Sequence, residues 1–215
     1  MISNLLIDLD GTLTDPKAGI IGCVQYALEA MGQEAPEAND LLWLIGPPLQ
    51  TSFETLLDGS GLDANEAIKI FRKRFGSVGL FENKIYQGVP EFLAEQKNAN
   101  KRLFIASTKP QIYIDRILKH FKIRHFFESV YGSELDGTRS IKSDLLRYIF
   151  SKLMFRANET VMIGDRIHDI EAAKCVGVSF IWEDYGYGDK LERDIANPDF
   201  ICDPIDELRK LLNKI

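Results

Sequence analysis

Short apolar runs separated by longer amphipathic segments recur along this sequence, and they restrict the folds that it can adopt. The runs that match buried strands are Asn4–Leu9, Arg102–Ala106, Val161–Ile163 and Ser179–Trp182. Apolar residues at spacings of three and four predict helices over Pro90–Asn98, Pro110–Phe121, Ser140–Phe155 and Ile167–Val176. Strands that alternate with helices of this length indicate βαβ units. We therefore predict an α/β fold with a parallel sheet and helices on both of its faces.

The alternation is interrupted directly after the first strand. Between Asp15 and Glu82 there is no convincing strand, and helical patterns follow one another instead: Asp15–Met31, Glu37–Ile45, Leu49–Leu57 and Ala64–Phe75. An all-helical insert of ~65 residues is too long for a loop and too short to be the main domain. We expect residues 15–82 to form a small helical cap, and residues 1–14 and 83–215 to form the α/β core.

Charge and cysteine content limit the classes of function. The 215 residues carry 26 Lys and Arg against 32 Asp and Glu, and this net charge of −6 argues against a nucleic-acid-binding protein. No apolar run approaches the ~20 residues of a membrane span, and no basic region typical of a signal peptide opens the chain. The three cysteines lack a CxxC spacing, which predicts neither a disulfide framework nor a thiolate metal site. We expect a cytoplasmic protein that binds neither a membrane nor a nucleic-acid polymer.

Two carboxylates lie at the end of the first predicted strand. Asp8 and Asp10 alternate along the extended chain and so lie on the same side of it, and Gly11 allows a sharp turn after them. Ligands of open α/β sheets bind beyond the carboxyl ends of the strands. Two carboxylates this close repel each other unless they share a cation, and Mg²⁺ prefers oxygen ligands. The alternative is that the pair caps a turn and faces solvent.

A second pair of carboxylates follows a later predicted strand. The run Thr160–Ile163 leads into Asp165, and Asp169 lies one helical turn further on, at a helix N-terminus. A carboxylate at a second strand tip can complete a metal site that two carboxylates from one strand cannot. Taken alone, Asp165 or Asp169 could instead cap the following helix.

Four motifs together resemble those of the haloacid dehalogenase superfamily. They are DLDGTLTD from Asp8 to Asp15, Ser107 within FIASTKP, Lys142 within GTRSIKSD, and GDRIHD from Gly164 to Asp169. They follow the family's order and span nearly the whole chain. The resemblance implies a Rossmann-like core, and the helical insert is similar to a cap of the C1 type. Segments such as IGPPLQTSF and GDRIHDI are similar to the branch that holds phosphoglycolate phosphatases and 5′-nucleotidases.

The resemblance implies a role for each motif residue. Asp8 would be the nucleophile that becomes an aspartyl phosphate, and Asp10 would protonate the leaving oxygen and then activate water. Mg²⁺ would be held by Asp8, Asp165 and the backbone carbonyl of Asp10, while Asp169 would orient metal-bound water. Lys142 would neutralise charge on the nucleophile and the phosphoryl group. The residues implied to bind the substrate phosphate are Leu9, Gly11, Ser107, Thr108 and Lys142.

Two positions depart from the family pattern. Thr108 stands where many relatives have Asn. Lys142 is followed by Ser143 rather than by Pro, so Lys109 competes with it for the role of the charge-neutralising lysine, although we favour Lys142. The run Tyr185–Gly188, after the last predicted strand, either reaches the mouth of the site or forms a plain turn.

These features predict a Mg²⁺-dependent phosphatase of small phosphomonoesters, with phosphoglycolate or a nucleoside 5′-monophosphate as the substrate. The carboxylate at Asp10 favours hydrolysis over C–Cl cleavage, because the dehalogenase branch of the family lacks it. The alternatives are a phosphomutase of a sugar phosphate and a non-enzymatic protein that binds a phosphate ligand. The expected partner is a small phosphorylated metabolite, and the chain is expected to be a monomer or a homodimer.

Overall fold

The computed structural model describes residues 2–215, and this part of the chain divides into two compact units. One unit contains the residues up to Thr14 together with Ile85–Ile215, and the other is the insert Asp15–Lys84, so that the second boundary falls at Lys84 rather than at Glu82. None of the helices in residues 2–215 is long and apolar enough to cross a membrane.

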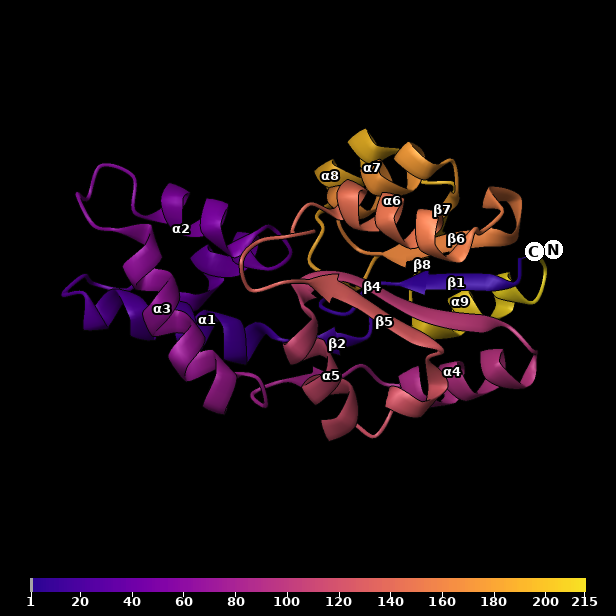
Figure 1. Ribbon diagram of the computed structural model, residues 1–215, viewed down its shortest axis with the longest axis horizontal. Coiled ribbons are helices and arrows are strands. Elements are labelled where there is room, and N and C mark those ends of the chain that lie inside the picture. The colour runs from indigo at the N-terminus through magenta and orange to yellow at the C-terminus, as the bar shows by residue number, and fades with distance from the viewer. Residues whose placement is uncertain (1) are drawn as a thin grey trace. The chain divides into compact units, whose positions relative to one another are not determined.

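A six-stranded parallel sheet lies at the centre of the first unit (Figure 1). Its strand order is β5–β4–β1–β6–β7–β8. The register places Ile7 beside both Ile105 and Ile163, so the carboxyl ends of three neighbouring strands meet at one edge of the sheet. The strands are β1 (Asn4–Ile7), β4 (Arg102–Pro110), β5 (Ser129–Ser133), β6 (Thr160–Gly164), β7 (Ser179–Glu183) and β8 (Phe200–Cys202).

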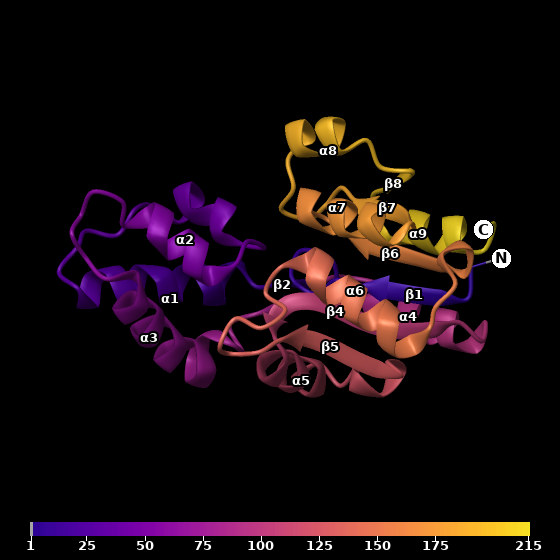
Figure 2. The same ribbon diagram turned by 45° about the horizontal axis from the view of Figure 1, so that its top comes forward.

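Helices cover both faces of this sheet. In Figures 1 and 2, α6 and α7 lie on one face, and α4 and α5 lie on the other. A terminal helix, α9, packs against α4, while the short α8 packs against α7. The helices are α4 (Val89–Asn98), α5 (Gln111–His120), α6 (Lys142–Leu153), α7 (Ile167–Val176), α8 (Lys190–Ala196) and α9 (Ile205–Leu212).

The core explains why the strands appear in the sequence as unbroken apolar runs. Parallel strands with helices on both sides bury all of their side chains, and all four residues of β1 are buried. Leu6, Phe104 and Met162 come from three adjacent strands and pack in one cluster with residues of α6 and α7. The sheet edge that carries the polar residues is therefore fixed by a large apolar core.

The insert has a core of its own. Phe71 packs on Phe53 and Phe75, with ring centroids 6.0 and 5.2 Å apart. The short strands β2 (Thr14–Asp15) and β3 (Lys84–Ile85) pair where the chain enters and leaves the insert. Its helical elements are α1 (Lys17–Ala30), the 3₁₀ helix Ala38–Leu44, α2 (Leu49–Leu56), α3 (Ala64–Arg74) and the π-helical turn Phe75–Gly79.

The predicted fold class is confirmed, but several element boundaries are corrected. The first strand ends at Ile7 rather than at Leu9, because the Leu9 carbonyl accepts turn hydrogen bonds. The strand β4, predicted as Arg102–Ala106, continues to Pro110, so the following helix begins at Gln111. The segment Glu37–Ile45 contains a 3₁₀ helix and no α-helix. The elements β5, β8, α8 and α9 were not predicted.

Candidate active site

A tight turn after β1 carries the first two carboxylates. The Leu9 carbonyl accepts the N–H groups of Leu13 and Thr14 at 2.9 and 3.0 Å. Gly11 has a φ of +87°, and a Cβ there would lie 2.1 Å from Oδ2 of Asp165. Only glycine satisfies both conditions, so the turn packs directly against the tip of β6.

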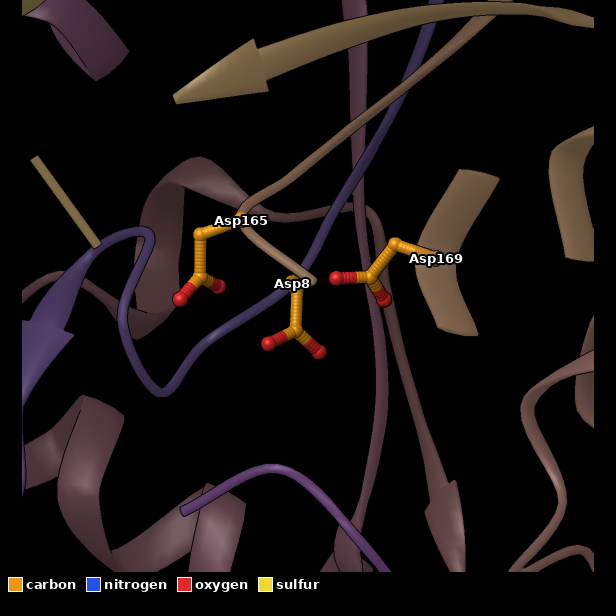
Figure 3. Close-up of side chains that lie close together, drawn as sticks. All are labelled: Asp8, Asp165 and Asp169. Carbon is orange, nitrogen blue, oxygen red and sulfur yellow. The ribbon is translucent and has the colours of Figure 1, made fainter. Parts of the chain in front are cut away.

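Three carboxylates converge at the polar edge of the sheet (Figure 3). Asp8 follows β1, Asp165 follows β6, and Asp169 lies in the first turn of α7. All three are buried, and one oxygen from each lies within 4.8 Å of the others. The parallel register of β1 and β6 therefore brings together residues that are more than 150 positions apart in the chain.

The helix-capping alternative holds for Asp169 in part. Its Oδ2 accepts the N–H of Arg166 at 3.2 Å, which caps α7. Its Oδ1 lies 2.7 Å from Nζ of Lys142, so the same carboxylate also belongs to the cluster. Asp165 has different partners: its Oδ1 accepts the hydroxyl of Thr12 at 3.1 Å, and its Oδ2 accepts the N–H of Tyr187 at 2.7 Å.

Two lysines neutralise different members of the site. Lys142, the first residue of α6, is buried and places Nζ 2.5 Å from Oδ1 of Asp8. Lys109, near the end of β4, places Nζ 2.5 Å from Oδ2 of Asp10. Both lysines that the sequence offers therefore contact carboxylates of the site. Lys142 contacts Asp8, the proposed nucleophile, and Lys109 contacts Asp10.

Burial controls the protonation of these groups. It raises the pKa of the Asp8 carboxyl to about 6, against an opposing effect of Lys142. Burial, followed by the charges of Asp169 and Asp8, raises the pKa of Asp165 well above its usual range. Burial also disfavours the charged form of Lys142, but the two neighbouring carboxylates outweigh it and raise the pKa of this lysine.

The donor set fits a hard divalent cation. Within residues 2–215, the ion pairs of the carboxylates of Asp8, Asp10, Asp165 and Asp169 are with the ammonium groups of Lys109 and Lys142, so four carboxyl groups share two lysines. Within residues 2–215, Oδ1 of Asp10 is buried and has no hydrogen-bond partner. All of these ligand atoms are oxygens, as Mg²⁺ prefers.

The other residues implied for phosphate binding lie at the same sheet edge. Ser107 and Thr108 lie on β4, directly beyond the residues that pair with β1. The Ser107 side chain is buried, and its Oγ accepts the N–H of Lys109 at 3.5 Å. The Thr108 carbonyl accepts the hydroxyl of Ser133 at 2.7 Å. Leu9 and Gly11 lie in the turn between Asp8 and Thr12.

Sequence reasoning missed one contributor to this site and left a second one open. Thr12 contacts Asp165, and its only signal in the sequence is a hydroxyl that follows the Asp-Gly pair. The loop after β7 reaches Asp165 through Tyr187, which decides against a plain turn for Tyr185–Gly188. The alternation of Tyr and Gly in that loop is the available signal, because glycines allow a close backbone approach.

Comparison with known proteins assigns the class. The family model of haloacid dehalogenase-like hydrolases matches residues 5–183, and the chain belongs to this family. It is 39% identical over 209 residues to a 5′-nucleotidase of Pseudomonas aeruginosa, which covers 97% of this chain and 95% of the relative. It is 33% identical to the tyrosine-protein kinase PtkA of Mycobacterium tuberculosis, covering 97% of this chain and 72% of that protein.

A solved structure extends this similarity to three dimensions. A predicted phosphatase from Clostridium acetobutylicum superposes with a TM-score of 0.94 at 35% identity, and the match covers 100% of both chains. The predictions of a haloacid dehalogenase-like fold and of a hydrolase of the phosphatase type are therefore confirmed.

Proposed function

We propose that this protein is a Mg²⁺-dependent phosphatase that hydrolyses small phosphomonoesters through an aspartyl phosphate at Asp8. The observation that carries this proposal is the contact between Asp8 and Lys142 inside the buried cluster of Asp8, Asp165 and Asp169. It combines a carboxylate nucleophile, a fixed positive charge and the ligands for a cation in one place.

The reaction has two halves. In the first, an oxygen of Asp8 forms a bond to phosphorus while the P–O bond to the leaving group breaks, and Asp10 gives its proton to the departing oxygen. In the second, Asp10 takes a proton from water, the water oxygen attacks phosphorus, and the bond to Asp8 breaks to release inorganic phosphate. Lys109 holds Oδ2 of Asp10, which leaves Oδ1 for the proton transfers.

The remaining residues bind and stabilise charge. Lys142 balances the negative charge on Asp8 and on the transferred group, while Ser107, Thr108 and the backbone of the Leu9–Gly11 turn bind phosphoryl oxygens. Bound Mg²⁺, held by Asp8, Asp165 and the Asp10 carbonyl, with Asp169 orienting its water, would screen the phosphate dianion from the carboxylates. The insert, residues 15–82 in the sequence-based division, would act as a lid that excludes water and selects the leaving group.

A nucleoside 5′-monophosphate is the favoured substrate, and phosphoglycolate is the second candidate. The similarity to a 5′-nucleotidase over nearly the full length of both chains supports this order. The partner would be the small metabolite alone, with no membrane or nucleic-acid polymer, and the chain would act as a monomer or homodimer. The three cysteines are free thiols, which is consistent with the cytoplasm as its compartment.

A substrate screen tests this proposal. Phosphate release would be measured with Mg²⁺ for nucleoside monophosphates, phosphoglycolate and sugar phosphates, with Asp8→Asn as the control for contaminating phosphatases. We expect the highest kcat/KM for a nucleoside 5′-monophosphate. Turnover that requires a catalytic sugar bisphosphate would indicate a phosphomutase instead, and binding without turnover of any ester would indicate a phosphate-ligand-binding protein.

A further inference from the structure

The loop that follows β7 is packed against a single carboxylate. The N–H of Tyr187 donates to Oδ2 of Asp165 at 2.7 Å, and the hydroxyl of Thr12 donates to Oδ1 of the same side chain at 3.1 Å. Asp165 is completely buried. Each of its oxygens is therefore held from a different segment of the chain, and the rotation of the carboxylate is fixed.

The approach of this loop depends on two glycines. A Cβ on Gly186 would lie 2.2 Å from Cβ and 2.4 Å from Oδ2 of Asp165. A Cβ on Gly188 would lie 2.0 Å from the Asp165 carbonyl oxygen and 2.4 Å from the ring of Trp182. The contacts are with buried atoms, so a side chain at either position would push the loop and Asp165 apart.

Tyr185 fixes the other end of the loop. Its hydroxyl donates to the carbonyl of Thr12 at 2.7 Å, and its ring lies 4.8 Å from that of Tyr86. Thr12 thus accepts a bond from the loop through its backbone and donates one to Asp165 through its side chain. The loop and the turn after β1 are therefore hydrogen-bonded to each other, and both are hydrogen-bonded to Asp165.

We propose that Tyr185–Gly188 is a positioning loop that sets the affinity and selectivity of the metal site by fixing Asp165, an inference that rests on the metal binding in the proposed function. Mg²⁺ requires near-ideal octahedral geometry, whereas Ca²⁺ accepts irregular coordination. Residues that orient a ligand typically contribute 10–100-fold to metal affinity. A displaced Asp165 should therefore weaken Mg²⁺ binding more than Ca²⁺ binding.

The test is calorimetric titration of the metal-free protein with Mg²⁺ and, separately, with Ca²⁺. We expect Gly186→Ala to raise the Kd for Mg²⁺ by at least about tenfold and the Kd for Ca²⁺ by a smaller factor. Gly22→Ala, in α1, is the matched control, because its Cβ would lie no closer than 3.7 Å to any neighbour. It should bind both ions as the wild type does.

Two further variants, Tyr185→Phe and Asp165→Asn, make the result of the titration decisive. Tyr185→Phe removes only the hydroxyl that contacts Thr12, and it carries the test if Gly186→Ala does not fold; we expect at least about a threefold increase in its Kd for Mg²⁺. If the loop variants kept the wild-type Kd for Mg²⁺, or if their Kd values for Mg²⁺ and Ca²⁺ rose by the same factor, the proposed role of the loop would be overturned. If wild type itself binds no Mg²⁺ and Asp165→Asn behaves identically, the metal in the proposed function fails, and the loop inference fails with it.

Discussion

The ammonium group of Lys142 lies 2.5 Å from Oδ1 of Asp8 and 2.7 Å from Oδ1 of Asp169, so one buried lysine joins α6 to two separate carboxylates. Removing one partner of a buried ion pair leaves uncompensated charge, which typically costs about 3–5 kcal/mol. The same lysine is thus a structural group in addition to its proposed catalytic role.

Lys142→Met should lower kcat/KM for every substrate by a common factor of at least about 10². In EDTA it should also lower the free energy of unfolding, because Asp8 and Asp169 lose their counter-charge. Activity assays on several esters and urea denaturation measure the two effects. Lys69→Met, at a side chain that is 72% exposed, is the control and should change neither quantity. Wild-type turnover in Lys142→Met would contradict the assigned role.

Asp8→Asn should abolish phosphate release, by a factor of at least about 10³, since the amide cannot form the covalent intermediate. Substrate binding and the circular dichroism spectrum should stay close to those of the wild type. Rapid quenching followed by mass spectrometry should detect a phosphorylated peptide that contains residue 8 only in the wild type. Asp58→Asn, at an exposed position of the insert, should remain active. Turnover comparable to the wild type in Asp8→Asn would refute the mechanism.

Metal removal should abolish activity. Within residues 2–215, two lysines form the ion pairs of the four carboxylates of the site, so we expect a phosphate dianion to need a further cation for productive binding. We expect exhaustive EDTA treatment to stop turnover, Mg²⁺ to restore it, and Ca²⁺ to inhibit by relaxing the coordination needed for in-line attack. Activity that survives EDTA would rule out the metal.

Glu183 gives a prediction about pH. This carboxyl at the end of β7 is fully buried, and burial, followed by the charge of Asp165, raises its pKa well above 4.5. The folded state therefore holds the proton more tightly than the unfolded state, so the stabilisation is present below pH 4.5 and is lost as the pH rises towards the folded-state pKa.

Glu183→Gln is neutral at every pH and escapes this loss. In EDTA it should be more stable than the wild type at pH 8, by about 1 kcal/mol or more, and the difference should shrink as the pH falls towards 4. Urea denaturation at several pH values measures the trend. Glu54→Gln, at an exposed position, should show no such dependence. A stability difference that does not vary with pH would contradict the argument.

The insert should decide which substrate is preferred. Trp43 exposes 40% of its surface although it is large and apolar, and it belongs to a unit that contains none of the residues proposed as catalytic. Trp43→Ala should raise KM and change the ratio of kcat/KM between nucleotides and phosphoglycolate, while p-nitrophenyl phosphate turnover changes by less than about twofold. Ile201→Ala, a half-exposed apolar residue of the other unit, is the control. If Trp43→Ala lowered kcat/KM by the same factor for all substrates, the insert would have only a structural role.

Strong local patterns in the sequence predicted much of this structure. The helix Ile167–Val176 was predicted to the residue, because its periodicity is clear and Gly177, with φ +73°, ends it. The strand β8 was missed, since it has three residues and leaves Ile201 half exposed. A short edge strand has no apolar run that distinguishes it from a loop.

The site was predictable where its residues belong to motifs and not where they depend on packing. Asp8, Asp165 and Asp169 could be grouped, because neighbouring parallel strands end at one edge of the sheet. The contact of Lys109 with Asp10 depends on how far β4 extends, and the contact of Tyr187 with Asp165 depends on a loop that lies beyond β7. Neither distance is encoded in local spacing.

The position of β1 in the sheet has a consequence for how the protein is made. This strand is translated before every other part of the sheet, yet its neighbours on either side begin at Arg102 and Thr160. The insert is a compact unit that lies entirely within Asp15–Lys84, so it can fold on the ribosome much earlier than the sheet. Until Thr160 has emerged from the ribosome, one edge of β1 is unpaired in the nascent chain. Asp8, at the end of this strand, then lacks the neighbouring carboxylates Asp165 and Asp169.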